Sequence, residues 1–311
     1  AFGFTNVLID IIKNEKPSHI AVVFDPPGGS VQRQEDYTEY KANREAMPED
    51  IRSMIPPIKE LIRAFNIEVI EVAGFEADDV IGTLATQATE KKLKVLISTG
   101  DKDMAQLVSE HVTLINTMSN TFMDERGVAE KFGVRPDQIV DYLALVGDTS
   151  DNIPGVPKCG PKTAVKWLNT YESLQGVINS AESVRGKVGE YLRESLKFLP
   201  MSCELATIRK DLELENSIDE LASAKPNIDG LRSMFTELEF RSWVDELNTD
   251  HTHAAEKSSS LSSVLIDYEV VLEENRLLVW IEKLSKAEIF AFDTETTSVD
   301  YMEAQLVGLS F

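Results

Sequence analysis

The stretch Gly74-Phe75-Glu76-Ala77-Asp78-Asp79 places three carboxylates within four positions. An apolar run at residues 67–72 precedes it, and a helical pattern of apolar residues begins at Val80. The pattern predicts a strand that ends in an acidic cluster at the start of a helix. The positive end of the helix dipole stabilises acids there, which accounts for one or two of the carboxylates. Because further acids recur at the ends of other predicted strands, we interpret the cluster as part of a divalent-metal site.

Short apolar runs at residues 20–24, 67–72, 95–97 and 112–115 predict strands, which alternate with helical patterns. This alternation indicates an α/β fold with a parallel sheet. Ligands of such sheets bind beyond the carboxyl ends of the strands. Three of the strands place acids at that edge. Solvation alone would not explain six acids there. The acids are Asp25, Glu76, Asp78, Asp79, Asp101 and Asp103.

A further acid pair, Asp148 and Asp151, follows a predicted helix at residues 136–146. The two side chains can face the same way on a turn. An ordinary capping loop is the alternative, since Asp and Ser both suit helix caps. With the six acids above, the pair would complete a second metal position. Two Mg²⁺ ions about 3.5–4 Å apart, or Mn²⁺ in their place, would use such a set to clamp a phosphate and activate a water.

Residues 31–47 carry basic and aromatic side chains among acids, without an apolar stripe. If this segment is helical, Tyr37, Lys41 and Arg44 fall on one face. One interpretation is an arch that grips phosphate, with Tyr37 or Tyr40 stacking on a base. The alternative is a solvated surface helix with internal ion pairs, which the composition supports at least as well.

The stretch from Asn152 to Tyr171 contains three lysines and no acid, which makes it a basic island in an acidic chain. Gly155 and Gly160 permit a tight hairpin between two helices. A glycine-rich turn that leads into a helix N-terminus suits phosphate binding. An ordinary helical hairpin is the alternative. The lysines are Lys158, Lys162 and Lys166.

The bulk composition limits the classes of function. At 311 residues the chain is long enough for two or three domains. No apolar run approaches the ~20 residues that span a bilayer, and the two cysteines form no disulfide framework, so we expect a cytoplasmic protein without a membrane partner. The histidines lack zinc-site spacing, which favours oxygen ligands for any metal. The net charge of −22 by itself argues against nucleic-acid binding, unless positive charge is concentrated locally.

Five motifs occur along the chain in an order that is specific in combination. They are Val22-Val23-Phe24-Asp25, Tyr40-Lys41-Ala42-Asn43-Arg44, Glu76-Ala77-Asp78-Asp79, Ser98-Thr99-Gly100-Asp101-Lys102-Asp103 and Gly147-Asp148-Thr149-Ser150-Asp151-Asn152-Ile153-Pro154-Gly155-Val156. Over residues 1–246 the sequence resembles the flap-endonuclease family of structure-specific 5′ nucleases, as found in the 5′–3′ exonuclease domain of bacterial DNA polymerase I. The resemblance implies a parallel-sheet, PIN-like core and a helical domain with a helix–three-turn–helix element. It also implies two-metal hydrolysis of DNA in repair and in Okazaki-fragment primer removal.

The resemblance implies roles for the matching residues. It makes Lys41, Arg44, Asp78 and Asp101 catalytic. The metal-site acids are Asp25, Glu76, Asp78, Asp79, Asp101, Asp103, Asp148 and Asp151. The DNA-binding residues are Arg33, Tyr37, Tyr40, Lys41, Arg44, Gly155, Val156, Lys158, Gly160, Lys162 and Thr163. The implied ligands are two Mg²⁺ ions, K⁺ at the helix–three-turn–helix, and DNA with 5′ flaps, nicks or RNA primers.

The predicted organisation has four parts. Residues 1–131 form the nuclease core and residues 132–248 the helical DNA-binding domain. A Ser-rich linker covers residues 249–263. Residues 264–311 resemble the start of an α/β, RNase H-like 3′–5′ exonuclease, with a predicted strand at 289–292 that ends at Asp293 and Glu295. The resemblance also implies a polymerase domain in the full-length chain.

Three departures from the family pattern matter, and one of them is Val31-Gln32-Arg33, which stands where Phe-Arg is commoner. In the family, the chain begins with a strand that carries an Asp-Gly motif. By the resemblance, that strand would lie before Ala1 and is not part of this sequence. Cys159 stands where a small aliphatic residue is usual. The absent first strand keeps open a second hypothesis, a catalytically impaired module that binds duplex DNA. A third, a phosphatase of the acidic α/β type, would not need the basic island.

Overall fold

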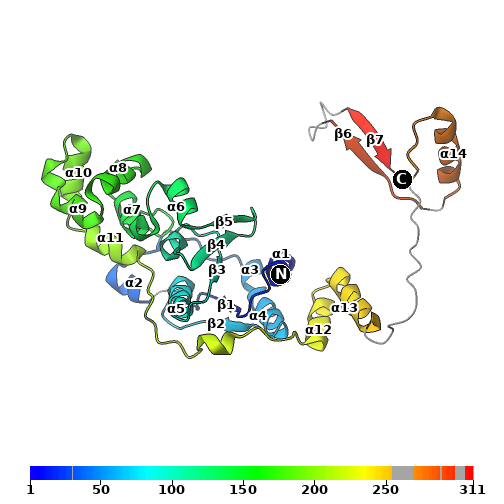
Figure 1. Cartoon of the computed structure of the whole chain (residues 1–311), viewed down its shortest axis with the longest axis horizontal. Helices are drawn as coiled ribbons and strands as arrows, with labels where there is room; N and C mark the ends of the chain where they lie inside the picture. Colours follow the sequence, from blue (N-terminus) through cyan, green and yellow to red (C-terminus); the bar gives the residue numbers. More distant parts are fainter. Residues whose placement is uncertain (30, 254–268, 288, 298–304, 311) are drawn as a thin grey trace. The chain divides into compact units, whose positions relative to one another are not determined.

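The computed structural model describes residues 1–29, 31–253, 269–287, 289–297 and 305–310. The chain divides into two compact units, Ala1–Ala254 and Ala255–Phe311, which are described separately (Figure 1). None of the helices within the described residues is both long enough and apolar enough to cross a membrane.

The first part of the larger unit combines short strands with helices. Its elements are α1 (Phe2–Glu15), β1 (Ala21–Val23), α2 (Val31–Asp36), α3 (Glu49–Arg52), α4 (Ile55–Ala64), β2 (Glu68–Ile70), α5 (Ala77–Glu90), β3 (Val95–Ser98), η1 (Asp103–Leu107), β4 (Val112–Asn116), β5 (Thr121–Met123) and α6 (Glu125–Phe132). The predicted strands and the helix after Asp79 are present. α3 ends at Arg52 and a new helix, α4, begins at Ile55, because Pro56 and Pro57 fit a first helical turn, where no backbone N–H is needed.

The strands form two small sheets within the described residues. β1 pairs with β2 in parallel, and Ala21 lies opposite Glu68. β3 pairs with β4 in parallel, and β5 is added antiparallel to β4. The predicted parallel pairing is therefore confirmed, but the single continuous sheet is not, since β1 and β3 are not paired. The sequence pattern missed β5 because it is short and two of its three residues are exposed.

The rest of the larger unit is mainly helical. Its elements are η2 (Pro136–Gln138), α7 (Ile139–Val146), α8 (Pro161–Tyr171), α9 (Leu174–Asn179), η3 (Ala181–Ser183), α10 (Lys187–Ser195), α11 (Leu199–Ala206), η4 (Ile218–Leu221), α12 (Ile228–Glu237) and α13 (Arg241–His253). Between α7 and α8 the chain turns tightly: a Cβ on Gly155 would lie 2.3 Å from the Gly147 nitrogen, so only glycine fits there.

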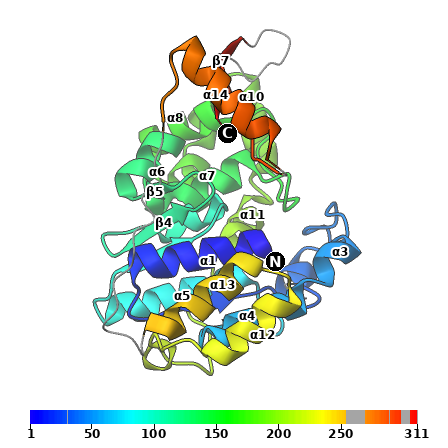
Figure 2. The ribbon, with the colours of Figure 1, turned by 90° about the vertical axis from the view of Figure 1, so that its right-hand side faces the viewer.

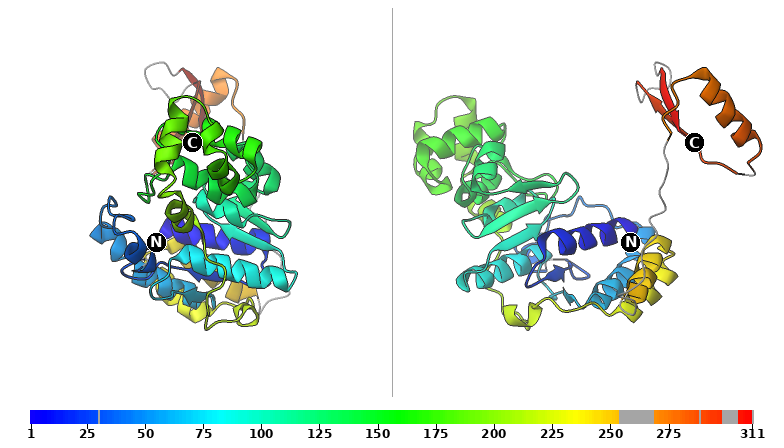
Figure 3. Two further views of the ribbon diagram at one scale, coloured as in Figure 1. Left: turned by 90° about the vertical axis from the view of Figure 1, so that its left-hand side faces the viewer. Right: turned by 45° about the vertical axis from the view of Figure 1, so that its right-hand side comes forward.

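The last two helices of this unit return to the core. Leu231 and Phe235 of α12 share a buried cluster with Leu61 and Ile62 of α4. Figures 2 and 3 show α12 and α13 beside α1 and α4, away from α6 to α10. The sequence places α12 and α13 in one helical domain with α7 to α11, whereas the structure packs them on the opposite part of the unit. Burial of apolar side chains against α4 explains this placement.

The smaller unit contains α14 (Glu274–Ser285) and the antiparallel strands β6 (Asp293–Thr296) and β7 (Leu306–Ser310). The predicted strand at 289–292 is wrong in register, because pairing with β7 begins at Asp293. Asp293 therefore begins the strand and Glu295 lies within it, whereas the sequence pattern placed both after the end of a strand. α13 continues through His253 into the predicted linker, whose residues 254–263 lie outside the described part.

Candidate metal and nucleic-acid site

The acidic stretch that opens α5 lies at the carboxyl end of the β1–β2 sheet. Glu76 occupies the N-cap position, and Asp78 and Asp79 lie in the first helical turn. Asp25, just beyond β1, accepts a hydrogen bond from the Ala77 nitrogen at 2.8 Å. This bond fixes the end of β1 to the start of α5, so that acids from two strand ends lie together as the sequence predicts.

Two half-buried acids at this edge lie among like charges. Burial, reinforced by Asp101 and Glu76, raises the pKa of Asp78 to about 7. Burial, reinforced by Asp101 and Asp148, raises the pKa of Asp103 to about 7. Within the described residues, Asp103 Oδ1 is buried without a hydrogen-bond donor. Negative charge is therefore concentrated in a way that a bound cation would stabilise.

The acid pair after α7 joins the same region. Asp148 is buried, and its Oδ1 accepts bonds from the nitrogens of Ser150 at 2.6 Å and Asp151 at 3.1 Å. Its Oδ2 lies 2.6 Å from Lys102 Nζ. Burial acts to raise the pKa of Asp148, but the Lys102 ammonium and the backbone donors outweigh it, and the pKa is lowered. The loop thus combines capping bonds with a carboxylate held in its charged form.

Basic side chains from residues 37–44 lie on these acids. Lys41 Nζ lies 2.6 Å from Glu76 Oε1 and 3.6 Å from Asp151 Oδ2. Arg44 Nη2 lies 2.5 Å from Asp151 Oδ1. The predicted helical face is wrong, because α2 ends at Asp36 and Lys41 adopts a left-handed φ of 55°. A series of turns brings Lys41 and Arg44 to the acids instead.

The predicted stacking role of Tyr40 is also wrong in this structure. Tyr40 is only 3% exposed, and its hydroxyl donates toward Glu76 at 3.1 Å and Asp151 at 3.3 Å. Burial beside these carboxylates raises the pKa of Tyr40. Tyr37 is half-buried and packs against the core. The turns after α2 direct both rings toward the protein, so neither is presented as a free stacking platform.

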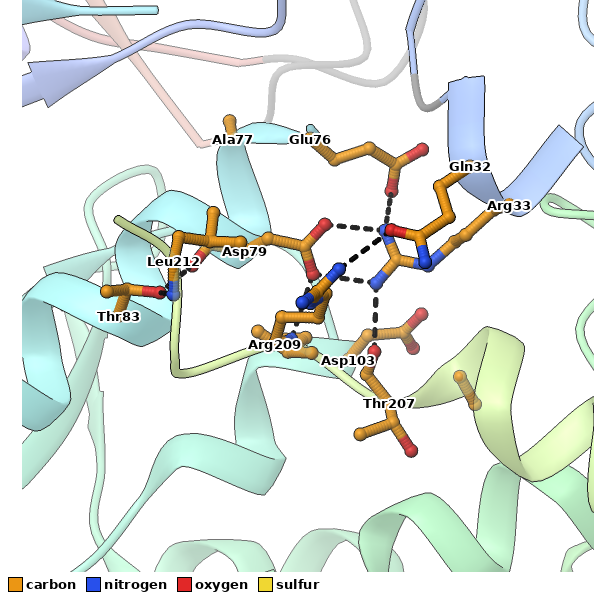
Figure 4. A network of polar contacts seen from close by, with 12 residues as sticks. Gln32, Arg33, Glu76, Ala77, Asp79, Thr83, Asp103, Thr207, Arg209 and Leu212 are labelled. Carbon is orange, nitrogen blue, oxygen red and sulfur yellow. Dashed lines mark hydrogen bonds and ion pairs between the residues drawn. The ribbon is translucent and has the colours of Figure 1, made fainter. Parts of the chain in front are cut away.

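Arg33 and Asp79 differ most from their predicted roles. Arg33 donates from Nη1 to Asp79 Oδ2 and from Nη2 to Asp79 Oδ1, both at 2.7 Å (Figure 4). It also reaches Glu76 at 3.2 Å and the Thr207 carbonyl at 2.8 Å. The Arg33 side chain is 11% exposed and that of Asp79 is 1% exposed. In this geometry Arg33 is not available to DNA, and both Asp79 oxygens are engaged away from a metal.

The remaining acids fit a divalent metal by chemistry, although they are not drawn together as ligands. In the part of the chain that is described, no three His, Cys, Asp or Glu side chains are close enough to hold a metal ion. Three of the acids, Glu76, Asp151 and Asp148, are instead paired with Lys41, Arg44 and Lys102 respectively. Carboxylate oxygens are the donors that Mg²⁺ and Mn²⁺ prefer. The feature that most favours a cation is Asp103 Oδ1, a buried oxygen that accepts no hydrogen bond within the described residues.

The basic island forms the turn before α8. Lys158 and Lys162 are exposed, Gly160 caps α8, and Thr163 is half-buried in its first turn. Val156 is 2% exposed and donates its N–H to the Leu145 carbonyl. Val156 therefore shapes the turn from inside, and the exposed lysines are the residues that can meet a phosphate.

One residue at the site was not among those that the sequence singled out. Lys102 lies between Asp101 and Asp103 in the motif and pairs with Asp148. The signal was its position between two predicted ligands. A charge of opposite sign there indicates a local counter-ion.

Comparisons with known proteins agree with this arrangement. Residues 1–133 match the family model described as 5′-3′ exonuclease, N-terminal resolvase-like domain, and residues 134–229 match 5′-3′ exonuclease, C-terminal SAM fold. A 5′-3′ exonuclease from Aquifex aeolicus is 38% identical, over 83% of this chain and 88% of that protein. The chain belongs to the 5′–3′ exonuclease family.

Members of this family also occur within longer chains. DNA polymerase I from Pseudomonas aeruginosa is 43% identical over 99% of this chain, which spans 35% of that relative. DNA polymerase I from Bacillus caldotenax is 35% identical over 99% of this chain, which spans 34% of it. The resemblance found in the motifs is thereby confirmed.

Solved structures show the same fold at low sequence identity. T5 5′-exonuclease with bound divalent metal ions (zinc) superposes with a TM-score of 0.59 at 20% identity, over 82% of this chain and 90% of that one. The catalytic core of Rad2 in complex with DNA substrate superposes with a TM-score of 0.54 at 20% identity, over 79% and 83%. The nuclease core followed by a helical part is therefore a shared architecture.

Proposed function

We propose that this chain is a structure-specific 5′–3′ exonuclease and flap endonuclease that hydrolyses DNA phosphodiesters with Mg²⁺. The observation that carries the proposal is the acidic edge around Asp101, where the half-buried Asp78 and Asp103 have raised pKa values and the buried Asp103 Oδ1 has no donor among the described residues. A phosphodiester substrate approaches such an edge only with cations present. Mn²⁺ is the alternative ion.

The acids that would hold two metal ions are Asp25, Glu76, Asp78, Asp101, Asp103, Asp148 and Asp151. Bound divalent ions would polarise the scissile phosphate and activate a water. Lys41 and Arg44 already contact Glu76 and Asp151. A substrate phosphate would replace these carboxylates as their partner, which would free the acids and hold the DNA backbone near them.

The exposed lysines of the basic island would bind the duplex part of the substrate. Lys158 and Lys162 precede and open α8, where the helix N-terminus also favours an anion. We propose K⁺ as a bridge between this turn and the DNA backbone. The substrates would be duplexes with 5′ flaps, nicks or RNA primers.

For the whole protein we propose a polymerase domain beyond this chain, with roles in DNA repair and Okazaki-fragment primer removal in the bacterial cytoplasm. Support comes from the similarity to DNA polymerase I over 99% of this chain. The smaller unit, with Asp293 and Glu295, would begin a 3′–5′ exonuclease domain.

The test is Mg²⁺-dependent release of a labelled 5′ flap from a synthetic duplex. Asp101→Asn is expected to slow cleavage by more than about 100-fold, since even residues beyond the metal ligands change activity by 10–100-fold. Arg126→Gln, which removes only an exposed ion pair with Glu130, is the matched control. Cleavage unaffected by Asp101→Asn would contradict the proposed site.

A module that binds duplex DNA without cutting it is the second candidate. The observation in its favour is that lysine and arginine side chains, and no close group of three ligands, occupy the acidic edge in the described residues. Flap binding with no cleavage in either Mg²⁺ or Mn²⁺ would select this candidate.

A further inference from the structure

Arg33 and Asp79 lie where three separate parts of the chain meet. Arg33 belongs to α2, which leads into the basic residues at 37–44, and Asp79 belongs to the first turn of α5. The third part is the return segment, residues 207–212, which follows α11. Asp79 Oδ1 accepts a bond from the Arg209 nitrogen at 2.9 Å, and Arg33 donates to the Thr207 carbonyl at 2.8 Å (Figure 4).

The return segment is held tightly against α5. A Cβ on Gly82 would lie 2.6 Å from Ile208 Cγ2 and 2.7 Å from the Arg209 carbonyl oxygen, so α5 approaches the segment as closely as glycine allows. Gln106 accepts a bond from the Ile208 nitrogen at 2.9 Å, and Thr83 accepts one from the Leu212 nitrogen at 3.3 Å. The return segment is therefore packed against α5 at Gly82 and Thr83 and is bonded to η1 through Gln106.

Asp78 and Asp79 are neighbours in the sequence, but their carboxylates face different parts of the protein. Successive helical residues point about 100° apart, so the two carboxylates cannot face the same ligand equally. The charges that act on Asp78 include those of Asp101 and Asp25. Both carboxylate oxygens of Asp79 accept hydrogen bonds from the Arg33 guanidinium, and the two side chains are almost fully buried. Such a planar, two-bond contact fixes orientation as well as charge.

We propose that Arg33 and Asp79 are a positioning pair and that Asp79 is not a metal ligand. The pair holds the first turn of α5, which carries Glu76 and Asp78, in register with residues 37–44 and with the return segment. Asp79 also takes the two shorter contacts of Arg33, at 2.7 Å, so that Glu76 receives only the longer one at 3.2 Å. This inference rests on the proposed function in taking Glu76 and Asp78 as the metal-binding acids.

Mn²⁺ binding by the whole chain, followed by electron paramagnetic resonance, separates the two roles of Asp79. Asp79→Asn is expected to weaken Mn²⁺ binding by about tenfold. Without the Asp79 charge, the Arg33 guanidinium pairs more closely with Glu76 and competes with the metal for that carboxylate. Adding Arg33→Gln removes that competing charge and is expected to restore the affinity to within about twofold of wild type. A true ligand cannot be restored in this way. A double variant that binds Mn²⁺ no better than Asp79→Asn alone would overturn the proposal.

Asp101→Asn is the matched control for this rescue. It is expected to weaken Mn²⁺ binding whether or not Arg33→Gln is present. Failure of the wild-type chain itself to bind Mn²⁺ would refute the proposed metal site. In that case, a measurement without metal tests whether Arg33 and Asp79 position the first turn of α5.

That second measurement is amide hydrogen exchange without metal. Arg33→Gln is expected to cause loss of protection in residues 37–44 and in the return segment together, since the pair joins both to α5. Arg33→Lys keeps the positive charge but cannot form the two parallel bonds to Asp79. It should cause a smaller loss of amide protection in residues 37–44 and in the return segment. Circular dichroism checks that each variant is folded. Loss of protection in only one of the two places would overturn the positioning role.

Discussion

Two arginine–aspartate pairs, Arg33–Asp79 and Arg44–Asp151, begin and end the same segment of the chain, and their surroundings differ sharply. The side chains of Arg33 and Asp79 are 11% and 1% exposed, and two parallel bonds join them. Those of Arg44 and Asp151 are 52% and 13% exposed, and a single contact of 2.5 Å joins them. The same two residue types therefore serve different purposes at the two ends of one segment.

The difference follows from desolvation. A buried pair has lost its water, so breaking it leaves an uncompensated charge in a poorly solvated place. An exposed arginine can exchange one anion for another, because water solvates both states. The buried pair fixes where the segment begins, and the exposed pair leaves Arg44 able to exchange Asp151 for another anion. The phosphate-binding role that we propose for this segment would need both properties.

The largest expected effect is on stability at the buried end. Asp79→Ala leaves the buried Arg33 guanidinium with Glu76, at 3.2 Å, as its remaining counter-ion and removes the bond from the Arg209 nitrogen, so we expect a loss of about 3 kcal/mol in the free energy of unfolding, the lower end for a broken buried pair. Urea denaturation followed by circular dichroism measures this loss.

The matched variant at the other end is Asp151→Asn, which removes the charge that faces Arg44 but keeps a polar side chain beside Tyr40, while Arg44 retains its bond to the Ser150 carbonyl. Its stability is expected to change by no more than about 1 kcal/mol. Equal losses in the two variants would remove the distinction between the pairs.

A smaller effect is expected on DNA affinity in the basic island. Lys162 is exposed, and within the described residues it has no ion-pair partner, unlike Arg44. Lys162→Ala is expected to weaken duplex binding at low salt and to reduce the slope of log K against log salt by about 0.9, the value for one phosphate contact. Fluorescence anisotropy with a labelled duplex over a salt series measures both quantities.

Lys94→Ala provides a control, because Lys94 is an exposed lysine just before β3, at the opposite end of that strand from Asp101 and outside the turn before α8. Its salt slope should match that of wild type. The same slope for wild type and Lys162→Ala would remove the basic island from the proposed DNA-binding surface.

The sequence predicted well what depends on local pattern. The strands, the acidic start of α5 and the glycine-rich turn before α8 each follow from periodicity or from residues with special backbone freedom. The partner of an acid, in contrast, comes from distant parts of the chain. Asp79 meets Arg33 from α2 and Arg209 from the segment after α11, and no spacing in the sequence encodes those contacts.

The segment after α2 shows a second limit of pattern. Helical spacing placed Tyr37, Lys41 and Arg44 on one face, but the left-handed backbone at Lys41 excludes a continuous helix. Tyr40 became buried for the same reason, since the turns direct its ring inward to Glu76. The identity of the basic residues was informative, whereas the geometry that presents them required the folded chain.

The smallest effect concerns salt and stability together. Arg44→Ala is expected to lower the free energy of unfolding by less than about 1 kcal/mol at low salt, and the loss should vanish near 1 M NaCl, where charges are screened within about 3 Å. The loss caused by Asp79→Ala should persist at the same salt concentration, because buried pairs are screened much less. Urea denaturation at both salt concentrations measures the two responses. If salt removes both losses alike, Arg33–Asp79 behaves as a solvated pair, and it could not hold α5 in place.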